Sequence, residues 1–284
     1  MLTRQLHELW TIPRLNIKVH KMFRVITANL NGIRSASSKG FFEWAGQQNA
    51  DVIGVQEVKA QDEQVKGIHC HIGKMAGQFH YAQKRGYSGV GIYMHEEPSD
   101  VVVGLGDNEF DNEGRWVEAR FDKPGRRLSI ISCYFPSGSS GEERQQAKFR
   151  FLALLYPKLL SLREGREFIL MGDVNIAHQN ADLKNWRSNQ KNSGFLPEER
   201  CWMTKVLGEA GLVDVYRVLH PDTTDECYTW WSNRGQAYAN NVGWRLDYQI
   251  ATPGIAELAR SATVYKAQKF SDHAPLTVDY EISL

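Results

Sequence analysis

Long hydrophobic runs are missing from this chain of 284 residues. The longest, residues 151–160, is about half of the roughly 20 residues that a membrane-spanning helix needs, and it contains Pro157 and Lys158. Cysteine is also scarce: four residues, at positions 70, 133, 201 and 227, with neither a CxxC pair nor the spacing of a zinc site. These absences argue against a membrane protein and a disulfide scaffold, and we expect reduced thiols in a cytoplasmic protein.

An excess of charge of either sign is absent as well. Thirty-four Lys and Arg residues stand against 33 Asp and Glu residues, for a net charge of +1. Any phosphate-binding surface must therefore come from local clustering of basic residues. The remaining composition, 42% hydrophobic and 24% charged, is that of a globular chain and excludes general disorder.

The chain shows no sign of an internal domain boundary. No composition shift or Pro/Gly/Ser-rich linker follows residue 22, so we expect a single domain over residues 22–284. Residues 1–21 differ, because they carry four basic residues against one acid and lead into a strand at Phe23. A targeting peptide would fit this bias, but no small-residue cleavage site or long apolar core is present. We interpret residues 1–21 as a non-essential extension, with Met22 as the true initiator.

Short apolar runs alternate with segments of helical periodicity, which is typical of an α/β or mixed α+β fold. Strands are predicted at residues 25–28, 51–55, 89–93, 116–121, 128–134, 168–171, 246–251 and 275–280. One predicted helix has a core-facing stripe made of Phe149, Leu152, Ala153, Tyr156, Leu159 and Leu160.

A second helix is predicted to begin at Pro197, which suits the first helical position, and to stop before Gly211. Glu198 and Glu199 favour the positive end of this helix. Its expected apolar face consists of Trp202, Met203, Val206, Leu207 and Ala210.

Three apolar strands run directly into acid or amide residues. Residues 25–28 lead to Asn29 and Asn31, residues 51–55 lead to Glu57, and residues 168–172 lead to Asp173 and Asn175. A buried strand end that carries an unpaired carboxylate costs free energy, so one case alone would be read as a capped loop. Three cases together indicate a ligand site, because strand ends are where such sheets place ligands.

The full polar set is rich in oxygen ligands and includes one histidine beside an aspartate: Asn29, Asn31, Glu57, Tyr134, Asp173, Asn175, Asp247, Asp272 and His273. No serine or cysteine nucleophile with a glycine-rich elbow accompanies it. Such ligands suit Mg²⁺ or Mn²⁺, which hold phosphate oxygens while retaining several waters. The set therefore indicates phosphodiester hydrolysis, which needs a metal, a positioned water and transition-state donors.

At this point the sequence resembles the exonuclease III type of apurinic/apyrimidinic endonuclease, within the endonuclease/exonuclease/phosphatase superfamily. Seven segments match in the order of that family: residues 28–34, 55–59, 133–138, 172–178, 194–200, 243–248 and 271–275. The resemblance implies an α/β fold, a four-layer sandwich of two packed mixed sheets flanked by helices. It also implies an active site at one edge of the sheets.

The same resemblance implies roles for the polar set. Asp173 would activate the attacking water, Asn175 and Asn29 would orient water and phosphate, and His273 (held by Asp247) and Tyr134 would contact the phosphate. Glu57 would be the principal metal ligand, with Asn31, Asp272, Asp173 and Asn175 near the ion. The number of metals stays open, as does the choice of base between Asp173 and the Asp247–His273 pair. Asp247 alone would be read as a structural strand acid.

DNA contacts are predicted from basic and apolar residues. The basic candidates lie in or near polar loops, where each alone would be read as solvated: Arg34, Lys59, Arg85, Lys184, Arg187, Lys191, Arg234 and Arg245. Trp230, Trp244 and Leu246 lie where the resembling family has an apolar pocket wall. Trp244 and Leu246 can point the same way, because alternate strand residues share a face. Such a pocket would accept an extruded abasic sugar and reject an intact nucleotide.

The resemblance implies a Mg²⁺-dependent enzyme, with Mn²⁺ as a substitute, that cleaves double-stranded DNA on the 5′ side of an abasic site and leaves a 3′ hydroxyl. We also expect 3′ exonuclease or 3′ phosphodiesterase activity, a monomer and no membrane partner. Two alternatives remain. One is a phosphatase of the same superfamily, against which residues 243–248 and the pair Trp230–Trp231 argue. The other is a catalytically inactive RNA-binding regulator of the same fold, against which the retained polar set argues.

Overall fold

The computed structural model describes residues 22–282 and residue 284. A seven-stranded sheet lies within them, in the order β14, β15, β1, β2, β5, β4, β3. Its central strands β1 and β2 are parallel and all its other pairs are antiparallel. The bounds are Phe23–Asn29 (β1), Val52–Gln56 (β2), His71–Ile72 (β3), Met75–His80 (β4), Val90–Met94 (β5), Ala259–Val264 (β14) and Leu276–Tyr280 (β15).

A second, six-stranded sheet has the order β10, β13, β9, β8, β7, β6 in the described residues. It is also mixed, because β8 and β9 are parallel and its other pairs antiparallel. The bounds are Asp100–Val103 (β6), Trp116–Arg120 (β7), Leu128–Tyr134 (β8), Glu167–Asp173 (β9), Val213–Asp214 (β10) and Asp247–Ala251 (β13). A small hairpin pairs β11 (Trp230–Trp231) with β12 (Gly243–Trp244).

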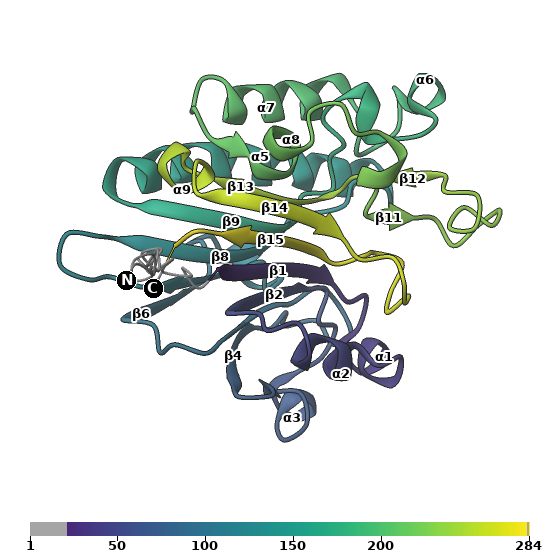
Figure 1. Cartoon of the computed structure of the whole chain (residues 1–284). Helices are drawn as coiled ribbons and strands as arrows, with labels where there is room; N and C mark the ends of the chain where they lie inside the picture. The colour runs from purple at the N-terminus through teal and green to yellow at the C-terminus, as the bar shows by residue number, and fades with distance from the viewer. Residues whose placement is uncertain (1–21, 283) are drawn as a thin grey trace, which may run out of the picture.

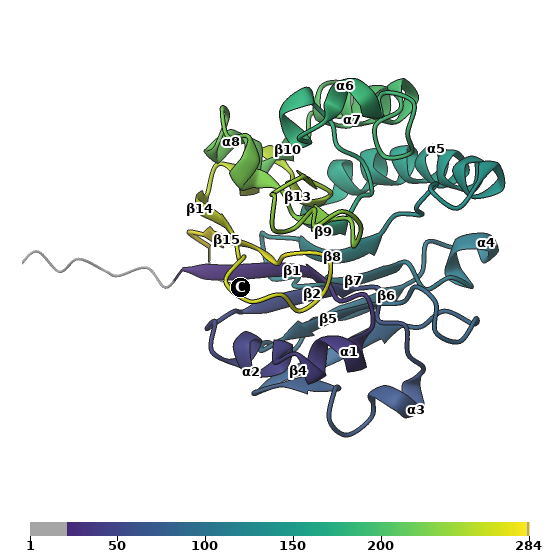
Figure 2. The same ribbon diagram turned by 90° about the vertical axis from the view of Figure 1, so that its right-hand side faces the viewer.

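The two sheets stack face to face, and helices cover both outer faces (Figure 1). Helices α1 (Ile33–Ser38), α2 (Phe41–Gly46) and α3 (Asp62–Val65) lie beside the seven-stranded sheet, and α5 (Glu142–Gly165) and α7 (Pro197–Leu207) lie beyond the six-stranded sheet (Figure 2). The other α-helices of the described residues are α4 (Asn108–Asp111), α6 (Trp186–Asn189), α8 (Val215–Leu219) and α9 (Pro253–Ala256). The predicted four-layer sandwich is confirmed.

Strand alternation builds the separate hydrophobic layers. In β9, Ile169 and Met171 pack between the sheets, whereas Phe168 and Leu170 face the layer that contains α5. Likewise Val25 of β1 points into the sandwich and Ile26 towards α2. Both faces of the central strands are therefore buried, which is why these strands read as continuous apolar runs.

The eight predicted strands are all present, with ends shifted by at most two residues. The strands that sequence reasoning missed are β3, β4, β6, β10, β11, β12 and β14. Several of these are only two residues long, β4 contains Gly77, and β6 is largely exposed. They therefore lack the sustained apolar pattern that reveals a strand. Among the described residues, no helix is both long and apolar enough to span a bilayer.

The predicted buried stripe of the first helix was partly wrong. Ala153 is exposed, and Phe149, Tyr156 and Leu160 are only half-buried. The buried stripe of α5 is instead Gln145, Ala147, Lys148, Phe151, Leu152, Leu155, Leu159 and Leu162. The apolar residues on both sides of α5 blur the helical period, and a lysine within the stripe conceals its true direction.

The second predicted helix is present as α7, with Pro197 in its first turn. It ends at Leu207 with Gly208 as its cap, four residues before Gly211, where the stop was predicted. Met203, Val206 and Ala210 are buried as predicted, whereas Trp202 and Leu207 are half-buried.

Candidate active site

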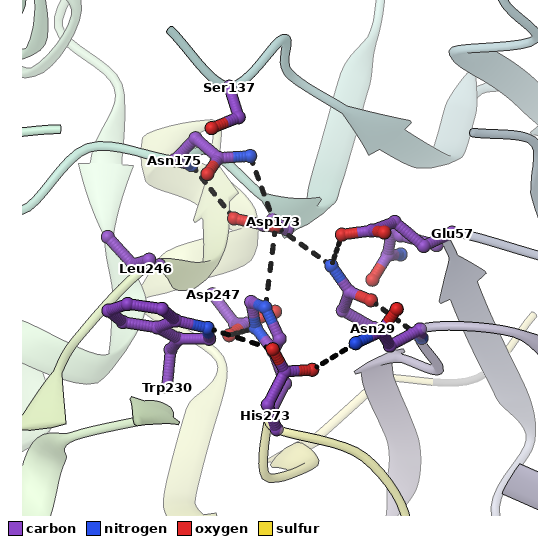
Figure 3. A network of polar contacts seen from close by, with 12 residues as sticks. Asn29, Glu57, Ser137, Asp173, Asn175, Trp230, Leu246, Asp247 and His273 are labelled. Atoms are coloured by element: carbon purple, nitrogen blue, oxygen red, sulfur yellow. Dashed lines mark hydrogen bonds and ion pairs between the residues drawn. The ribbon is translucent and has the colours of Figure 1, made fainter. Parts of the chain in front are cut away.

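The polar residues that follow the strands meet at one edge of the sandwich (Figure 3). Asn29 ends β1 and pairs with Gln56 at the end of β2, so Glu57 follows directly beside it. In the other sheet Tyr134 ends β8 opposite Asp173 at the end of β9. Parallel pairing thus brings the ends of distant segments together, as the strand-end pattern predicted.

A glycine permits the close approach that places Asp173. Gly172 has φ = 148°, and a Cβ on it would lie 1.9 Å from the carbonyl oxygen of Cys133. No larger residue fits between β8 and β9 at this point. The backbone before Asp173 is therefore fixed by a residue whose only contribution is its lack of a side chain.

Left-handed backbone conformations concentrate at this edge. Asn31, Glu57, Lys59 and Asn175 have φ values between 46° and 55°. Asparagine tolerates this region, but glutamate and lysine adopt it rarely, so the surrounding structure must hold Glu57 and Lys59 in place. Strain of this kind accumulates at functional sites.

Asn29 joins two carboxylates. Its Nδ2 donates to Glu57 Oε1 and to Asp173 Oδ2, both at 2.9 Å. Asn175 supports the same carboxylate, donating from its backbone N to Asp173 Oδ1 at 2.9 Å and from Nδ2 to Asp173 Oδ2 at 3.1 Å. The predicted grouping of Asn29, Glu57, Asp173 and Asn175 is present in the structure.

His273 is held by a buried aspartate. Its Nδ1 lies 2.8 Å from Asp247 Oδ2, and its Nε2 points towards Asp173 Oδ2 at 3.8 Å. Thr229 Oγ1 accepts from the backbone N of Asp247 at 3.1 Å, and Ser271 Oγ accepts from the backbone N of His273 at 2.9 Å. Asp247 therefore pairs with the histidine as predicted, and the reading of it as a structural strand acid no longer accounts for its position.

Asp272 borders this cluster and is held by two hydrogen bonds. Asn31 Nδ2 donates to its Oδ1 at 2.8 Å, and Trp230 Nε1 donates to its Oδ2 at 3.2 Å. Lys59 approaches from the other side, 2.6 Å from Glu57 Oε2 and 2.5 Å from Asn31 Oδ1. Asp272 and Asn31 thus adjoin the Glu57–Asp173 pair through hydrogen bonds.

Negative charge exceeds positive charge in this cluster. Burial raises the pKa of Asp173, and Asp247 and Glu57 raise it further against the opposing effect of His273. Burial alone would lower the pKa of His273, but Asp247 and Asp173 outweigh it and raise that pKa. Burial likewise opposes ionisation of Glu57, yet Lys59 and Asn29 lower its pKa. Glu57 is therefore a stable anion, and His273 is positioned as a hydrogen-bond donor.

The donor set fits a hard divalent cation. Ligand atoms of Glu57, Asp173 and His273 lie within 4.8 Å of one another. The raised pKa of His273 disfavours the neutral imidazole that a metal requires, so the carboxylates of Glu57 and Asp173 are the better ligands. A bound cation would also offset the repulsion that raises the pKa of Asp173.

A pocket of about 260 Å³ opens beside these carboxylates. Trp230, Trp244 and Leu246 line it together, and the two indole rings meet edge to face with centroids 6.2 Å apart. The predicted pocket wall is therefore assembled as one surface. The other lining residues that sequence reasoning missed are polar or small: Ser137, Ser139, Asn192, Ser193 and Gly194. Two of them, Ser137 and Gly194, lie within the matched segments, which was the only available signal.

The predicted basic residues separate into three groups. Arg34 and Lys59 border a shallow depression with Gly32 and Gly86. The others that are exposed, on loops or on the short helix α6, are Arg85, Lys184, Arg187, Lys191 and Arg234. Arg245 was predicted wrongly, because its side chain is buried and bonded to Asp182 and Asp214. Its place near a polar loop led to the prediction, but the chain between β12 and β13 directs its side chain into the protein.

Another missed residue supports Tyr134 from behind. Arg115 is buried, donates from Nη1 to the Tyr134 backbone oxygen at 2.9 Å, and lies 4.8 Å from the centre of the Tyr134 ring. Burial and the carboxylates of Glu57 and Asp173 raise the pKa of the Tyr134 phenol, which is therefore a neutral donor. No sequence motif distinguishes Arg115 from a solvated arginine.

A carboxylate–amide cluster at the edge of a two-sheet sandwich, next to a pocket, defines a hydrolase of phosphate esters. The chain belongs to the endonuclease/exonuclease/phosphatase family, whose sequence pattern matches residues 26–273. Within that family it is a member of the exonuclease III type, so the resemblance found from sequence is confirmed.

Curated relatives agree with this assignment. An exodeoxyribonuclease of Bacillus subtilis is 35% identical over 258 residues, covering 89% of this chain and 97% of the relative. The DNA repair nuclease APEX1 of Danio rerio is 33% identical, covering 90% of this chain and 81% of the relative. Among solved structures, an AP endonuclease from Archaeoglobus fulgidus superposes with a TM-score of 0.81 at 27% identity, covering 92% of this chain and all of that one.

Proposed function

We propose that the protein is a DNA repair nuclease that cleaves the phosphodiester on the 5′ side of an abasic site in duplex DNA and leaves a 3′ hydroxyl. One observation carries the proposal: the anionic pair Glu57–Asp173 opens directly onto a pocket walled by Trp230, Trp244 and Leu246. An abasic nucleotide lacks base stacking and is easily extruded into such a pocket. Activity as a 3′ exonuclease or 3′ phosphodiesterase would use the same carboxylates.

Dependence on a divalent metal is typical of the family, and Mg²⁺, with Mn²⁺ as a substitute, is the ion we propose. Glu57 and Asp173 would hold it, with Asn31, Asp272 and Asn175 close by. When bound, it would offset charge on the phosphate and favour ionisation of water.

The chain's own groups supply the remaining chemistry. Asp173 accepts a proton from the attacking water, because it is the buried carboxylate whose pKa is raised. Asn29 and Asn175 orient the water and the phosphate through their amides. His273, fixed by Asp247, donates to a phosphate oxygen as charge develops, and the Tyr134 phenol, which also lines the pocket, is a second donor to the phosphate.

The decisive experiment uses a duplex labelled at the 5′ end with one abasic site. Wild type should cut it in Mg²⁺ or Mn²⁺ and not in EDTA, and activity should return when metal is added back. Glu57→Gln should need more Mg²⁺ for half-maximal rate, because one anionic ligand is lost. Full cleavage in EDTA, or an unchanged Mg²⁺ requirement in Glu57→Gln, would contradict the proposal.

The same protein preparation separates the alternatives. A phosphatase would release inorganic phosphate from phosphate monoesters faster than it cuts the abasic duplex. An inactive RNA-binding regulator would bind RNA and cut neither substrate. The intact set of Glu57, Asp173 and His273 favours the nuclease over the regulator.

We further propose a cytoplasmic monomer in which residues 22–284 form one catalytic domain. The four cysteines are all free thiols, in keeping with a reducing compartment. Sedimentation of the full chain would check the monomer, and fractionation of the source cells would check the compartment.

A further inference from the structure

A buried ion pair lies outside the catalytic cluster and plays no part in the chemistry above. Lys148 of α5 and Glu199 of α7 are both 0% exposed, and Nζ lies 2.6 Å from Oε1. Lysine and glutamate side chains are almost never fully buried unless they are paired. Their burial therefore needs a physical reason.

Each charged group also holds a loop of the pocket. Lys148 Nζ donates to the backbone oxygen of Asn175 at 2.7 Å. Glu199 Oε2 accepts from the backbone N of Gly194 at 2.7 Å and from that of Leu196 at 3.0 Å. Gln145 Nε2 donates to Glu199 Oε1 at 3.0 Å. The pair thus ties the loop after β9 to the loop before α7.

Both tied residues, Asn175 and Gly194, line the pocket. Asn175 has a left-handed backbone and aims its amide at Asp173. Gly194 fits between Asn175 and Trp244: a Cβ on it would lie 3.2 Å from the Asn175 oxygen and 3.3 Å from the Trp244 ring. The backbone N of Ala177 also donates to the Gly194 oxygen at 2.8 Å. A shift of either loop would therefore move both the amide and the indole.

A buried ion pair is a poor source of stability, because desolvation of both charges offsets their attraction. An apolar pair of similar volume would fill the space between α5 and α7 equally well. What an apolar pair cannot do is donate to Asn175 and accept from Gly194. The hydrogen bonds to these two loops are what the charged pair uniquely supplies.

We infer that Lys148 and Glu199 are positioning residues, which hold the Asn175 amide and the Gly194–Trp244 wall in register with Asp173. The inference rests on the proposed function in one respect, because its test measures the cleavage of abasic DNA. Misplacement of a reacting group by about 1 Å can lower a rate by about 100-fold, so loss of the pair should act on turnover more than on binding.

The test compares Lys148→Met, the double variant Lys148→Met/Glu199→Gln, and Leu159→Ala as a control. Leu159 lies on the same helix in the apolar core, so its truncation lowers stability without touching either loop. Lys148→Met should lower the single-turnover rate at saturating abasic DNA by about 10- to 100-fold, with Kd changed by less than about threefold. Leu159→Ala should change neither.

The double variant separates positioning from stability. It removes the unpaired charge that Lys148→Met leaves behind, so its melting temperature should return towards that of wild type. The new side-chain amide at position 199 can still accept from the backbone N of Gly194, but nothing donates to Asn175, so the rate should stay low. A double variant that regains rate together with melting temperature would overturn the inference.

A measurement without substrate keeps this result separate from the proposed reaction. Hydrogen exchange followed by mass spectrometry should be faster in Lys148→Met than in Leu159→Ala at residues 174–177 and 193–196, with the two variants compared at equal global stability. Equal exchange in the two variants would overturn the positioning role, whatever the substrate proves to be. Failure of wild type to cut abasic DNA would instead count only against the proposed function.

Discussion

Two buried charged clusters lie close together in this fold and have opposite electrostatics. In the catalytic cluster, four carboxylates (Glu57, Asp173, Asp247 and Asp272) form ion pairs only with Lys59 and His273 among the residues that the structure describes. In the arginine cluster, which consists of Asp182, Asp214, Arg217 and Arg245, each negative charge has a positive counterpart. Asp173 and Asp182 are equally buried, at 1% and 0% exposure.

The two aspartates respond differently because of their partners. Burial opposes ionisation of both. Arg245 and Arg217 nevertheless lower the pKa of Asp182 to about 2, whereas Asp247 and Glu57 add to burial and raise that of Asp173. A buried carboxylate is thus structural where guanidinium groups neutralise it. Where the negative charge is not neutralised, as at Asp173, the site can bind a cation and accept a proton.

The largest expected effect is on the rate when the catalytic aspartate is neutralised. Asp173→Asn should bind abasic duplex nearly as wild type does, while its single-turnover rate falls by about 10²- to 10⁴-fold, because the amide cannot accept a proton. Its melting temperature should stay near that of wild type, since relief of repulsion offsets the altered hydrogen bonds. Equal losses in affinity and rate would show that Asp173 is structural.

The matching change in the arginine cluster should have the opposite outcome. Asp182→Asn leaves Arg217 and Arg245 with Asp214 as the remaining carboxylate of the cluster, which should lower the free energy of unfolding by roughly 3–5 kcal/mol. Well below its melting temperature, the folded variant should cut abasic DNA at nearly the wild-type rate. Urea unfolding and single-turnover cleavage measure the two quantities. An Asp182→Asn variant that is inactive but as stable as wild type would contradict the structural role of Asp182.

Lowering the pH should reduce the contribution of Asp182 to the free energy of unfolding. The pKa of Asp182 is lowered from 3.8 to about 2 in the folded state, so its contribution, about 2 kcal/mol, is complete above pH 4 and is lost as pH falls through 2. About half should be lost by pH 3. The difference in unfolding free energy between wild type and Asp182→Asn should therefore shrink from pH 6 to pH 3. A difference that is constant over this range would show that Asp182 is not the titrating group.

The sequence revealed the catalytic cluster better than the arginine cluster for a physical reason. Asp173 and Glu57 follow apolar strands directly, and parallel pairing of β1 with β2 and of β8 with β9 brings such strand ends together. Arg245 and Asp182 are 63 residues apart, and neither interrupts an apolar pattern in a way that signals burial. Lys148 was hidden similarly, because its partner Glu199 lies on another helix. Pairing between distant charges leaves little trace in a single sequence.

A smaller effect is expected from substitution of Trp244, which precedes Arg245 in the chain and lines the pocket. Trp244→Ala should lower the ratio of single-turnover rates on abasic and undamaged duplex by roughly tenfold, because the wall that excludes a base is opened. Trp202→Ala provides a control, since Trp202 belongs to α7 and does not line the pocket. Circular dichroism should show both variants folded. An unchanged ratio in folded Trp244→Ala would remove this residue from the recognition surface.

The smallest effect is expected from removal of residues 1–21, which lie outside the described residues. Both charged clusters are built from residues after Phe23, and both edges of β1 are already occupied, by β2 and β15. A chain beginning at Met22 should therefore keep the melting temperature, the Kd for abasic duplex and the single-turnover rate of the full chain. The basic residues of this segment could still add phosphate contacts, so the affinity should be compared at two salt concentrations. A truncated chain that binds more weakly only at low salt would assign residues 1–21 to DNA binding, whereas a lower melting temperature would assign them to the fold.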